Sequence, residues 1–513
     1  MLLRTDYVMG LDIGTTGIKT AIYDFQGKLI AYEYNEYPLI CERPGWAEQD
    51  PNDWWLAIKK GIYNVIKKSR INKEKILAIG TSSLTASPVL IDKKGNVLCR
   101  SPIWMDRRSI DECSTLQSRI GKQKLYELTG RRPDPMFNIY KLMWIKRKTP
   151  QIIKETYKVL QAKDYINYKL TNQIATDFSI ASTTQAMNLK SLKWEEDIFS
   201  SAEISINIMP EIKTCTEVLG LVDSKIANEL GLSNKTKVVV GGADTTIAAL
   251  GCGAIDEGDL AITIGTCSDV SMCSNYPVVD KEMRMGCYPY LAKGSYLTIA
   301  GANSSGIALK WFRDQFCEIE KIKARKKRTD TYKILDKLAK EIPPGCEGLV
   351  FLPYLSGERS PIFNHKARGI FAGINLKHTK AHFIRSILEG VSLSIKDRID
   401  IHRELGFKTK KVILAGGGAN SKLWRQIITD MIEAPTYVVK GEEAIGLGAA
   451  ILAAVGAEIY SDIKKACKNM VFLGNKSFPI EGNSKVYQKE YALHKILYES
   501  NINFFNQSYL SER

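Results

Sequence analysis

Three short glycine-rich turns are the segments of this sequence best suited to binding phosphate: residues 14–17 (GTTG), 265–266 (GT) and 416–420 (GGGAN). Glycine lets the backbone approach an anion closely, so that several N–H groups can converge on it. The threonines of the first two turns can also donate hydrogen bonds from their hydroxyl groups. We therefore predict that phosphate groups are bound by Gly14, Thr15, Thr16, Gly265 and Thr266.

Lys19 lies two residues past the first turn and can place a positive charge beside the same phosphate. The third turn precedes an apolar pattern of helical period. Its N–H groups and the helix dipole therefore favour an anion or a polar nucleotide group there. From this we predict contacts with a nucleotide at Gly417, Gly418 and Asn420.

The usual nucleotide fingerprints are absent from the sequence. No GxxxxGK[ST] motif occurs, which excludes a P-loop protein. The third turn has Ser421 where a dinucleotide-binding GxGxxG motif has its last glycine, and no opening βαβ unit precedes it. A dinucleotide-dependent dehydrogenase therefore remains an alternative that this turn supports poorly.

Two aspartates lie where apolar strand patterns end at small-residue turns. Asp12 closes one such run and directly precedes the first phosphate turn, where a carboxylate without a partner is costly. A Mg²⁺ ion, bound directly or through water, would offset that cost, so Asp12 is the metal candidate. Asp244 precedes a helical pattern that starts at Thr245, which makes it a helix N-cap candidate and leaves a chemical role open.

The histidines restrict the choice of a general base. All five of them follow residue 364. A Ser-His-Asp arrangement or a histidine-rich metal site is therefore excluded from the first 364 residues. A general base in that part of the chain is expected to be Asp or Glu.

The elements that position these residues alternate between strands and helices. Residues 8–32 read as strand, turn and two further strands, and residues 260–272 repeat the strand, Gly-Thr turn and strand about 250 residues later. A strand at 411–415 precedes the third turn, and apolar stripes at 384–395 and 424–432 have helical period. This alternation indicates an α/β fold.

The two similar strand–turn–strand units favour a duplicated architecture over two unrelated hairpins. A chain of 513 residues is too long for one core, so two domains are expected. Glycine density rises at residues 251–258, and we place the boundary there. The predicted domains are residues 1–252 and residues 253–513.

Composition excludes several classes of protein. No apolar run of about 18 residues is free of charges and glycine breaks, so a membrane-spanning helix is not expected. The first residues do not resemble a signal peptide, and a cytoplasmic location is predicted. The eleven cysteines form no CxxC pair and are expected to be buried free thiols.

The net charge of +16 first suggests a nucleic-acid partner. The excess lysine is scattered, however, and the one dense run, residues 321–328 (KIKARKKR), is expected to be a solvated helix or loop face. A basic balance suits anionic small molecules such as nucleotides equally well. We expect a small-molecule substrate, no nucleic acid and no membrane as partners, and a homodimer is left open.

Together these segments resemble the FGGY family of carbohydrate kinases, the sugar-kinase branch of the actin-like ATPase fold. The resemblance runs nearly end to end. Residues 369–390 (GIFAGINLKHTKAHFIRSILEG) fit the C-terminal family signature. Residues 12–20 (DIGTTGIKT) resemble the family's first phosphate motif, and residues 258–269 (GDLAITIGTCSD) its second. Residues 241–255 (GGADTTIAALGCGAI) resemble the segment of the catalytic aspartate, and residues 415–435 (AGGGANSKLWRQIITDMIEAP) the adenosine-binding loop.

The resemblance implies two actin-like (RNase H-like) domains with an active-site cleft between them. It implies ATP- and Mg²⁺-dependent phosphorylation of a hydroxyl of a small sugar, sugar acid or polyol, of the xylulose or gluconate type. Asp244 would be the catalytic base, and the third turn would bind adenosine. A non-catalytic, actin-like sugar sensor that binds ATP is the second alternative. The N-terminal signature is imperfect, because residues 136–148 keep Lys141 and Trp144 but have Asn138 at a usual Pro, Ser or Thr position.

The sugar-binding segments agree with the family only in part. Trp104 and Asp106, within residues 102–109 (PIWMDRRS), match the substrate-pocket motif. Where xylulokinases and gluconokinases carry Met-His, and glycerol kinases Arg-Glu, this chain has Thr85-Ala86. D-Xylulose and D-gluconate are therefore expected to be mediocre substrates, with another ketose, polyol or aldonate preferred. The expected substrate contacts are Thr85, Trp104, Asp106 and Asp244.

Overall fold

The computed structural model describes residues 6–441, 443–474 and 476–511 of the chain. The chain forms two compact units, each made of three stretches. The first unit contains the chain up to Ile255, with Ser274–Leu297 and Glu443–Phe472. The second contains Asp256–Cys273, Thr298–Glu442 and the chain from Leu473 onward. The boundary at residues 252–253 stays a prediction.

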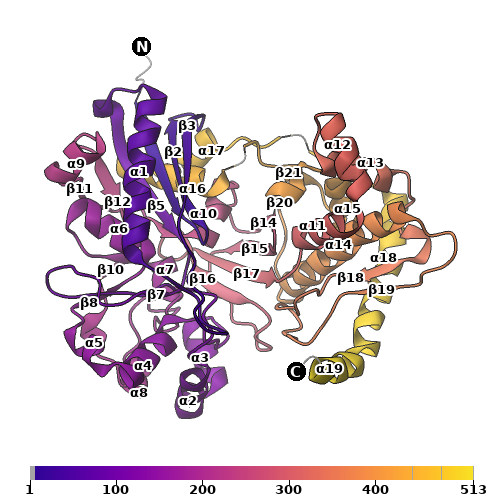
Figure 1. The fold of residues 1–513 in the computed structure, drawn as a ribbon, viewed down its shortest axis with the longest axis horizontal. Helices are drawn as coiled ribbons and strands as arrows, with labels where there is room; N and C mark the ends of the chain where they lie inside the picture. The colour runs from indigo at the N-terminus through magenta and orange to yellow at the C-terminus, as the bar shows by residue number, and fades with distance from the viewer. Residues whose placement is uncertain (1–5, 442, 475, 512–513) are drawn as a thin grey trace. The chain divides into compact units, whose positions relative to one another are not determined.

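The first unit is built on a mixed sheet with the strand order β11-β12-β5-β1-β2-β3 (Figure 1). Strand β2 pairs antiparallel with both β1 and β3, whereas β5 pairs parallel with both β1 and β12. Strand β11 pairs antiparallel with β12. A short strand, β13, pairs with the end of β5. The bounds are β1 Tyr7–Ile13, β2 Gly17–Asp24, β3 Leu29–Glu36, β5 Ile76–Ser83, β11 Val218–Leu221, β12 Lys237–Val239 and β13 Gly242–Ala243.

Helix α16 (Ala444–Gly456) packs directly on β1 and β5 because both strands have glycine at the contact. A Cβ on Gly10 would lie 2.2 Å from the carbonyl oxygen of Gly446, and one on Gly80 would lie 2.0 Å from that of Ala449. Helix α1 (Pro51–Ser69) contacts β2 and β3. Because successive side chains of a strand point to opposite faces, these contacts place α1 and α16 on the two faces of the sheet.

A helical group adjoins this sheet within the first unit. It contains α2 (Ile110–Ile120), α3 (Lys122–Thr129), α4 (Asn138–Lys148) and α8 (Glu196–Ala202). These helices share an apolar cluster that includes Leu116, Leu125 and Ile145. This group carries Lys141 of the imperfect family signature.

The second unit repeats the arrangement of the first. In its sheet, β14 is antiparallel to β15 and parallel to β20, which is in turn parallel to β21. This confirms the predicted α/β class and the duplicated strand–turn–strand unit. The bounds are β14 Asp259–Ile264, β15 Ser268–Ser274, β20 Lys411–Ala415 and β21 Thr436–Val438.

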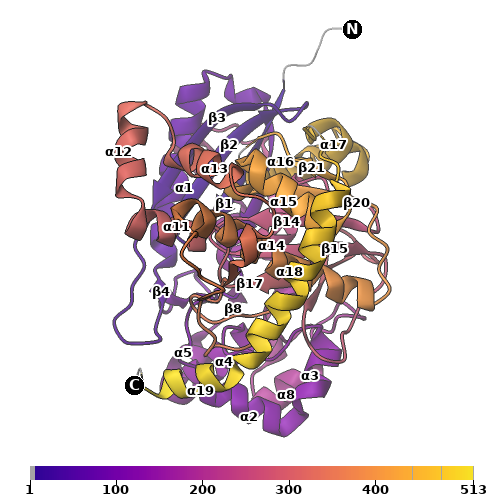
Figure 2. The ribbon, with the colours of Figure 1, turned by 90° about the vertical axis from the view of Figure 1, so that its right-hand side faces the viewer.

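Long helices complete the second unit (Figure 2). Helix α14 (Lys380–Glu404) contacts α15 (Lys422–Ile432), and both contact α18 (Glu481–Ser500). The predicted apolar stripes of α14 and α15 are buried. The basic run lies on and just after α12 (Glu318–Lys326), with most of its side chains exposed as expected.

Two composition-based expectations can be compared with the structure. All eleven cysteines are free, as predicted, but Cys41 is exposed and Cys99 and Cys267 are half-buried, so not all of them are buried thiols. Among the described residues, no helix has the length and apolar character needed to cross a membrane.

Candidate active site

The first phosphate turn joins β1 to β2 and is held from outside the turn. The N–H of Gly14 donates to the carbonyl of Gly17 at 3.1 Å, which closes the turn. The side chain of Gln49 donates to the carbonyl oxygen of Thr15 at 2.8 Å, and the hydroxyl of Tyr37 donates to that of Gly14. The backbone is thus fixed before any ligand arrives.

Asp12 ends β1 beside this turn and is 3% exposed. Its Oδ1 has no hydrogen-bond partner among the described residues, and its Oδ2 lies 3.9 Å from Nζ of Lys19. Burial raises the pKa of Asp12 to about 7; Lys19 opposes this rise, while Asp244 and Glu443 add to it. An unpartnered carboxylate oxygen close to other acids fits a hydrated Mg²⁺ ion, which prefers oxygen ligands.

Lys19 lies between two acids. Its Nζ is 3.2 Å from Oε2 of Glu443 and faces Asp12. Burial lowers the pKa of Lys19, but the charges of Asp12 and Glu443 outweigh this and raise it above its usual value. Glu443 was not predicted from the sequence, since no local pattern connects it with a residue more than 400 positions earlier.

Asp244 is the first residue of helix α10 (Asp244–Gly251). Ala243 occupies the N-cap position, so the N-cap prediction was wrong by one residue. The carboxylate of Asp244 accepts hydrogen bonds from the backbone N–H of Thr245 at 2.7 Å and from its hydroxyl at 3.2 Å. Ala243 and Ile13 both pair with Ser83 of β5, which brings Asp244 to the same edge of the sheet as Asp12.

A pocket of about 380 Å³ brings together the predicted phosphate, metal and base residues of the first unit, whereas the predicted sugar contacts Thr85, Trp104 and Asp106 are not part of its lining. Its wall combines a phosphate-binding turn, a lysine and two acids. The turn and the lysine can bind a charged phosphate, and an acid can accept a proton. The residues that line it are Asp12, Gly14, Thr15, Thr16, Gly17, Lys19, Tyr32, Tyr34, Asp244 and Ile445.

A buried polar network supports the junction that precedes Asp244. The N–H of Ala243 donates to Oγ of Ser179 at 2.9 Å, and this hydroxyl donates to Oδ2 of Asp177 at 2.5 Å. The other oxygen of Asp177 lies 3.1 Å from Nζ of the fully buried Lys163, which also contacts Asp164 at 2.6 Å. The network fixes the backbone from which α10 starts, and no local sequence pattern indicates it.

Trp104, predicted to contact the sugar, is tied to the first phosphate turn. Its indole N–H donates to the hydroxyl of Thr15 at 3.0 Å, and 38% of the residue is exposed. An exposed aromatic face beside a phosphate turn is suited to the apolar face of a small carbohydrate.

Asp106 has a different environment from the one expected for a substrate contact. It is 0% exposed, and its carboxylate accepts from the N–H of Ala47 at 2.7 Å and from the guanidinium of Arg108 at 2.7–3.0 Å. Arg108 in turn lies 2.9 Å from Glu48. Asp106 therefore stabilises the segment that carries Trp104, and its contact with a substrate stays a prediction.

The predicted sugar loop is held by a buried lysine. Nζ of Lys141 donates to the carbonyl oxygens of Ala86 at 2.6 Å, Pro102 at 3.0 Å and Ile103 at 2.7 Å. Burial lowers the pKa of Lys141 to about 7. Ala86 has φ 54°, a left-handed conformation that an L-residue adopts only when its surroundings hold it. Lys141 thus fastens the half-buried Thr85 and its neighbour to the Trp104 segment.

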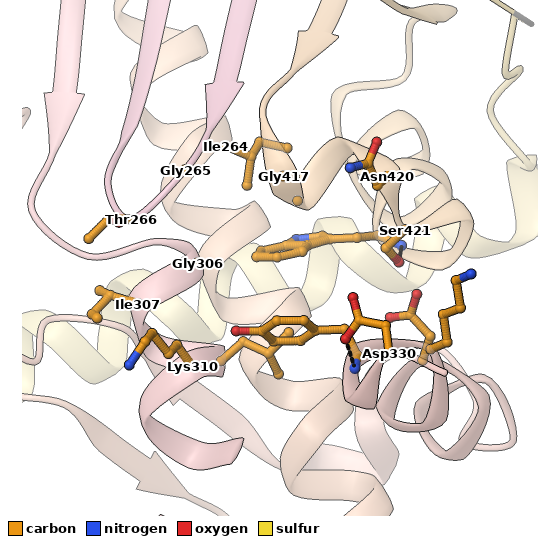
Figure 3. Close-up of a pocket in the computed structure, with 16 residues that line it drawn as sticks. Ile264, Gly265, Thr266, Gly306, Ile307, Lys310, Asp330, Gly417, Asn420 and Ser421 are labelled. Carbon is orange, nitrogen blue, oxygen red and sulfur yellow. Dashed lines mark hydrogen bonds between the residues drawn. The ribbon is translucent and has the colours of Figure 1, made fainter. Parts of the chain in front are cut away.

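The second unit contains a pocket of about 450 Å³ (Figure 3). Figure 3 shows Thr266 and Gly306 towards one end and Asn420 and Ser421 towards the other. The wall is mainly apolar, with a few polar groups, as is typical of nucleotide and cofactor sites. All predicted nucleotide residues of this unit line the pocket, namely Gly265, Thr266, Gly417, Gly418 and Asn420, together with Ile264, Ile307, Lys310, Tyr332, Asp336 and Trp424 among others.

The third turn differs from its prediction in one respect. It does not open helix α15 directly, because Gly417–Asn420 forms a separate 3₁₀ turn and Ser421 is the N-cap, accepting from the N–H of Trp424. The helix N-terminus is therefore already partly satisfied. Flat, apolar walls around Gly418 suit a nucleoside better than a phosphate.

Comparison with known proteins finds similarity over most of the chain. Residues 7–251 match the N-terminal domain, and residues 260–457 the C-terminal domain, of the FGGY family of carbohydrate kinases. The xylulose kinase of Bacillus subtilis (strain 168) is 29% identical over 492 residues, 96% of each chain. The gluconokinase of the same strain is 32% identical over 487 residues, 94% of each chain.

Solved structures agree with this match. The crystal structures of a ligand-bound xylulose kinase and of a gluconate kinase, both from Lactobacillus acidophilus, each superpose with a TM-score of 0.90 at 28% identity. In both cases the match covers 98% of this chain and 99% of the other. The actin-like fold of two sheet-containing domains, expected from the sequence, is therefore confirmed.

Proposed function

The chain belongs to the FGGY family of carbohydrate kinases, and we propose that it transfers the γ-phosphate of ATP to one hydroxyl of a small sugar, sugar acid or polyol. The observation that carries the proposal is the single pocket of the first unit that contains Asp12, Lys19 and Asp244 around a phosphate-binding turn. The names of the relatives, xylulose kinase and gluconokinase, support a substrate of that type.

The nucleotide would occupy the pocket of the second unit. Gly417, Gly418 and Asn420 would contact the adenosine, since the wall around them is flat and largely apolar. Gly265 and Thr266, which are exposed at the opposite end, would contact the phosphates (Figure 3). The carbonyls of this turn accept from the N–H groups of Gly306 and Ile307, and this orients the turn.

In the first unit, Asp12 would hold Mg²⁺, either directly through its unpartnered oxygen or through a bound water. When bound, Mg²⁺ neutralises charge on the phosphates. Lys19 adds a second positive charge at the same place, and the hydroxyls of Thr15 and Thr16 can donate to phosphate oxygens. Phosphoryl transfer has a loose transition state, so alignment and neutralisation of charge supply most of the catalysis.

Asp244 would accept the proton of the attacking hydroxyl. Thr245 holds its carboxylate in one orientation, and the Ser179 network fixes the backbone immediately before it. The sugar would lie against Trp104 and the loop of Thr85. Lys141 joins this loop to the segment of Trp104, and Asp106 stabilises that segment. A cytoplasmic location and a homodimer stay predictions.

A coupled ADP-release assay over tetritols, pentitols, ketopentoses and aldonates tests this function. We expect one carbohydrate to stimulate ADP release, with both ATP and Mg²⁺ required. ATP hydrolysis without stimulation by any carbohydrate would favour the sensor or assembly ATPase instead. A carbohydrate-dependent absorbance change of NAD(P)H would favour the dehydrogenase.

A further inference from the structure

Helix α12 and the residue before it direct large apolar side chains toward solvent. Ile319 is 58% exposed and Ile322 is 42% exposed, and Phe316, the last residue of α11 (Gly306–Phe316), is 52% exposed. Isolated exposed apolar residues are common at protein surfaces, but a surface helix normally turns its apolar residues toward the core. Apolar residues that recur at three-residue intervals and stay exposed therefore form a patch that indicates a binding partner.

The inner face of α12 is complete without this patch. Glu320 and Ala324 are buried, and Nζ of Lys380 lies 3.1 Å from Oε2 of Glu320. The helix packs on α11 and on α13 (Thr331–Lys340), which lies next to it in Figure 1. Since successive residues of a helix are about 100° apart, Ile319 and Ile322 point away from the stripe of Glu320 and Ala324. The two isoleucines are thus not part of the core of the second unit.

Positive charge lies on the same face of α12. Lys323 and Lys326 share this face with Ile319 and Ile322, because the four positions have the spacing i, i+3, i+4 and i+7. Most of the basic run is exposed, and its exposed members form no ion pair with any described residue. These members are Lys323, Arg325, Lys326, Lys327 and Arg328.

An exposed carboxylate at the start of α12 offsets little of this charge. Oε2 of Glu318 lies 2.6 Å from Nζ of Lys321, which is the half-buried lysine of the run. Lys321 first, and then Arg325, lower the pKa of Glu318. The surface around the isoleucines therefore keeps an excess of positive charge.

The combination of apolar and basic side chains distinguishes between the partners that a basic surface can bind. A second copy bound through the same face would bring two basic runs together, and like charges repel. A nucleic acid would pair with the lysines through its phosphates but would leave the isoleucines without an apolar partner. A bilayer with anionic headgroups matches both features, because basic side chains contact the headgroups while apolar ones enter the boundary with the acyl chains.

We propose that α12 and the end of α11 form a peripheral binding surface for anionic lipid bilayers. Phe316, Ile319 and Ile322 would enter the headgroup boundary, and the basic run would contact the acidic headgroups. The expectation of no membrane partner followed from the lack of a spanning segment, which a peripheral contact does not need. Binding through so small a surface should be weak and reversible. The proposal does not depend on the kinase function.

Cosedimentation of the full chain with vesicles tests the proposal. The vesicles contain either phosphatidylcholine alone or phosphatidylcholine with about 40% phosphatidylglycerol, which makes the surface anionic. We expect the partition coefficient to be at least about tenfold higher for the anionic vesicles. It should fall by at least about tenfold when salt is raised from about 0.05 M to about 0.5 M, because salt screens the attraction. Equal partition into both kinds of vesicle, or no partition into either, would overturn the proposal.

Charge reversal tests the place of the contact. Lys323→Glu combined with Lys326→Glu should lower partition into anionic vesicles by at least about tenfold. The matched control is Lys408→Glu combined with Lys410→Glu, which makes the same change in net charge at exposed lysines elsewhere in the second unit. The control should bind within about twofold of the wild type. Equal losses for both variants would show that net charge and not α12 is responsible, and the proposal would be wrong.

Removal of the apolar side chains tests insertion. Ile319→Ser combined with Ile322→Ser should also lower partition by about tenfold, since less apolar surface leaves water. Leu493→Ser combined with Ile496→Ser is the control, because these residues of α18 have the same spacing and are 46% and 56% exposed. This control should bind like the wild type. If the isoleucine variant binds anionic vesicles as well as the wild type does, nothing is inserted and the proposal fails.

A soluble polyanion separates lipid from nucleic acid. Polyuridylate added to the anionic vesicles should compete weakly, because it offers phosphates and no apolar layer. Complete displacement at equal phosphate concentration, together with direct binding that the isoleucine variant retains, would identify the surface as one for nucleic acid and would overturn the proposal. Thermal unfolding shows whether each variant is folded, and the lipid and salt comparisons with the wild type decide the question even if a variant is not.

Discussion

The two Gly-Thr turns have the same scaffold and different surroundings. Each joins the first strand of its sheet to an antiparallel partner, and each lies next to a parallel strand. In the first unit, Asp12 precedes the turn and pairs across the strands with Lys19. In the second, the equivalent position is Thr263, which pairs with Asp269. An aspartate–lysine pair thus flanks the first turn, and a threonine–aspartate pair flanks the second.

The pockets differ in the same sense. The pocket beside the first turn is the smaller, and two of its charged residues, Asp12 and Lys19, lie on the two strands that the turn joins. The charged residues of the pocket beside the second turn lie outside the strands that this turn joins; they are Lys310, Asp330, Lys333 and Asp336. Duplication of a fold therefore preserves the turn, because the backbone requires it. We expect the residue one position before the Ile-Gly-Thr sequence, Asp12 in the first copy and Thr263 in the second, to determine which copy can hold a metal ion.

The largest effect is expected from Asp244→Asn. The change removes the proton acceptor and keeps the size of the side chain, so kcat should fall by about 10²–10⁴-fold. ATP affinity, measured by titration, should stay the same because Asp244 is not among the predicted nucleotide contacts. A variant that keeps more than half of the wild-type kcat on the best substrate would show that Asp244 is not the base.

Asp12→Ala tests the difference between the two turns directly. Loss of the unpartnered carboxylate should raise the Mg²⁺ concentration needed for half-maximal rate by about 10–100-fold, with little change in sugar KM. Thr263→Ala, the matched change at the second turn, should leave the Mg²⁺ titration unaltered. Equal titrations for both variants would move the metal site away from Asp12.

Lys141→Met should affect the sugar and not the nucleotide. Without the ammonium, the carbonyls of Ala86, Pro102 and Ile103 lose their common donor and the sugar loop loosens. We expect sugar KM to rise about tenfold, since a few kcal/mol of loop order are at stake, while ATP KM is unchanged. Initial-rate kinetics with each substrate varied in turn decide this, and a change in ATP KM alone would contradict it.

The same lysine predicts a pH dependence of stability. Its folded pKa of about 7 lies below its unfolded value of 10.5, so between these pH values the unfolded chain binds a proton that the folded chain does not. The contribution of Lys141 to the free energy of unfolding should therefore rise as pH increases from 7 to 10.5. Denaturant titrations at pH 7, 8.5 and 10 should show this increment in the wild type and not in Lys141→Met.

Gly418→Ala is expected to have the smallest effect. The added Cβ would lie 2.4 Å from Cγ2 and 3.0 Å from Cβ of the buried Ile264, so the wall of the pocket must shift slightly to accept it. ATP KM should rise by about threefold to tenfold, in line with a modest overpacking cost, and sugar KM and the Mg²⁺ titration should not change. An effect on sugar KM larger than that on ATP KM would argue against a nucleotide in this pocket.

Features set by neighbouring residues were predictable from the sequence. The strands around residues 8–32 and 260–272, strand 411–415 and the helices that contain 384–395 and 424–432 all follow from local periodicity. The turns with Gly14 and Gly265 and the two aspartates at strand ends follow from the same patterns. The predicted N-cap, Asp244, differs by one residue from the observed N-cap, Ala243.

Features set by distant residues were not predictable. Glu443 reaches Lys19, Ser179 supports Ala243, and the ring of Tyr288 stacks on Arg131. No short-range period records such pairs, since the two members of each lie far apart in the sequence. The burial of Asp106, which accepts from the N–H of Ala47, likewise depends on a residue 59 positions earlier and cannot be inferred from the local motif.

The packing of α16 on β1 and β5 has a consequence for how the protein is made. The central strands are synthesised within the first 83 residues, but the helix that covers one face of them ends at Gly456. At a synthesis rate of about 5–20 residues per second, that face stays uncovered for tens of seconds. A nascent chain, or a fragment that stops near residue 252, therefore presents a bare apolar sheet face, and expression of such a fragment should yield aggregated rather than folded protein.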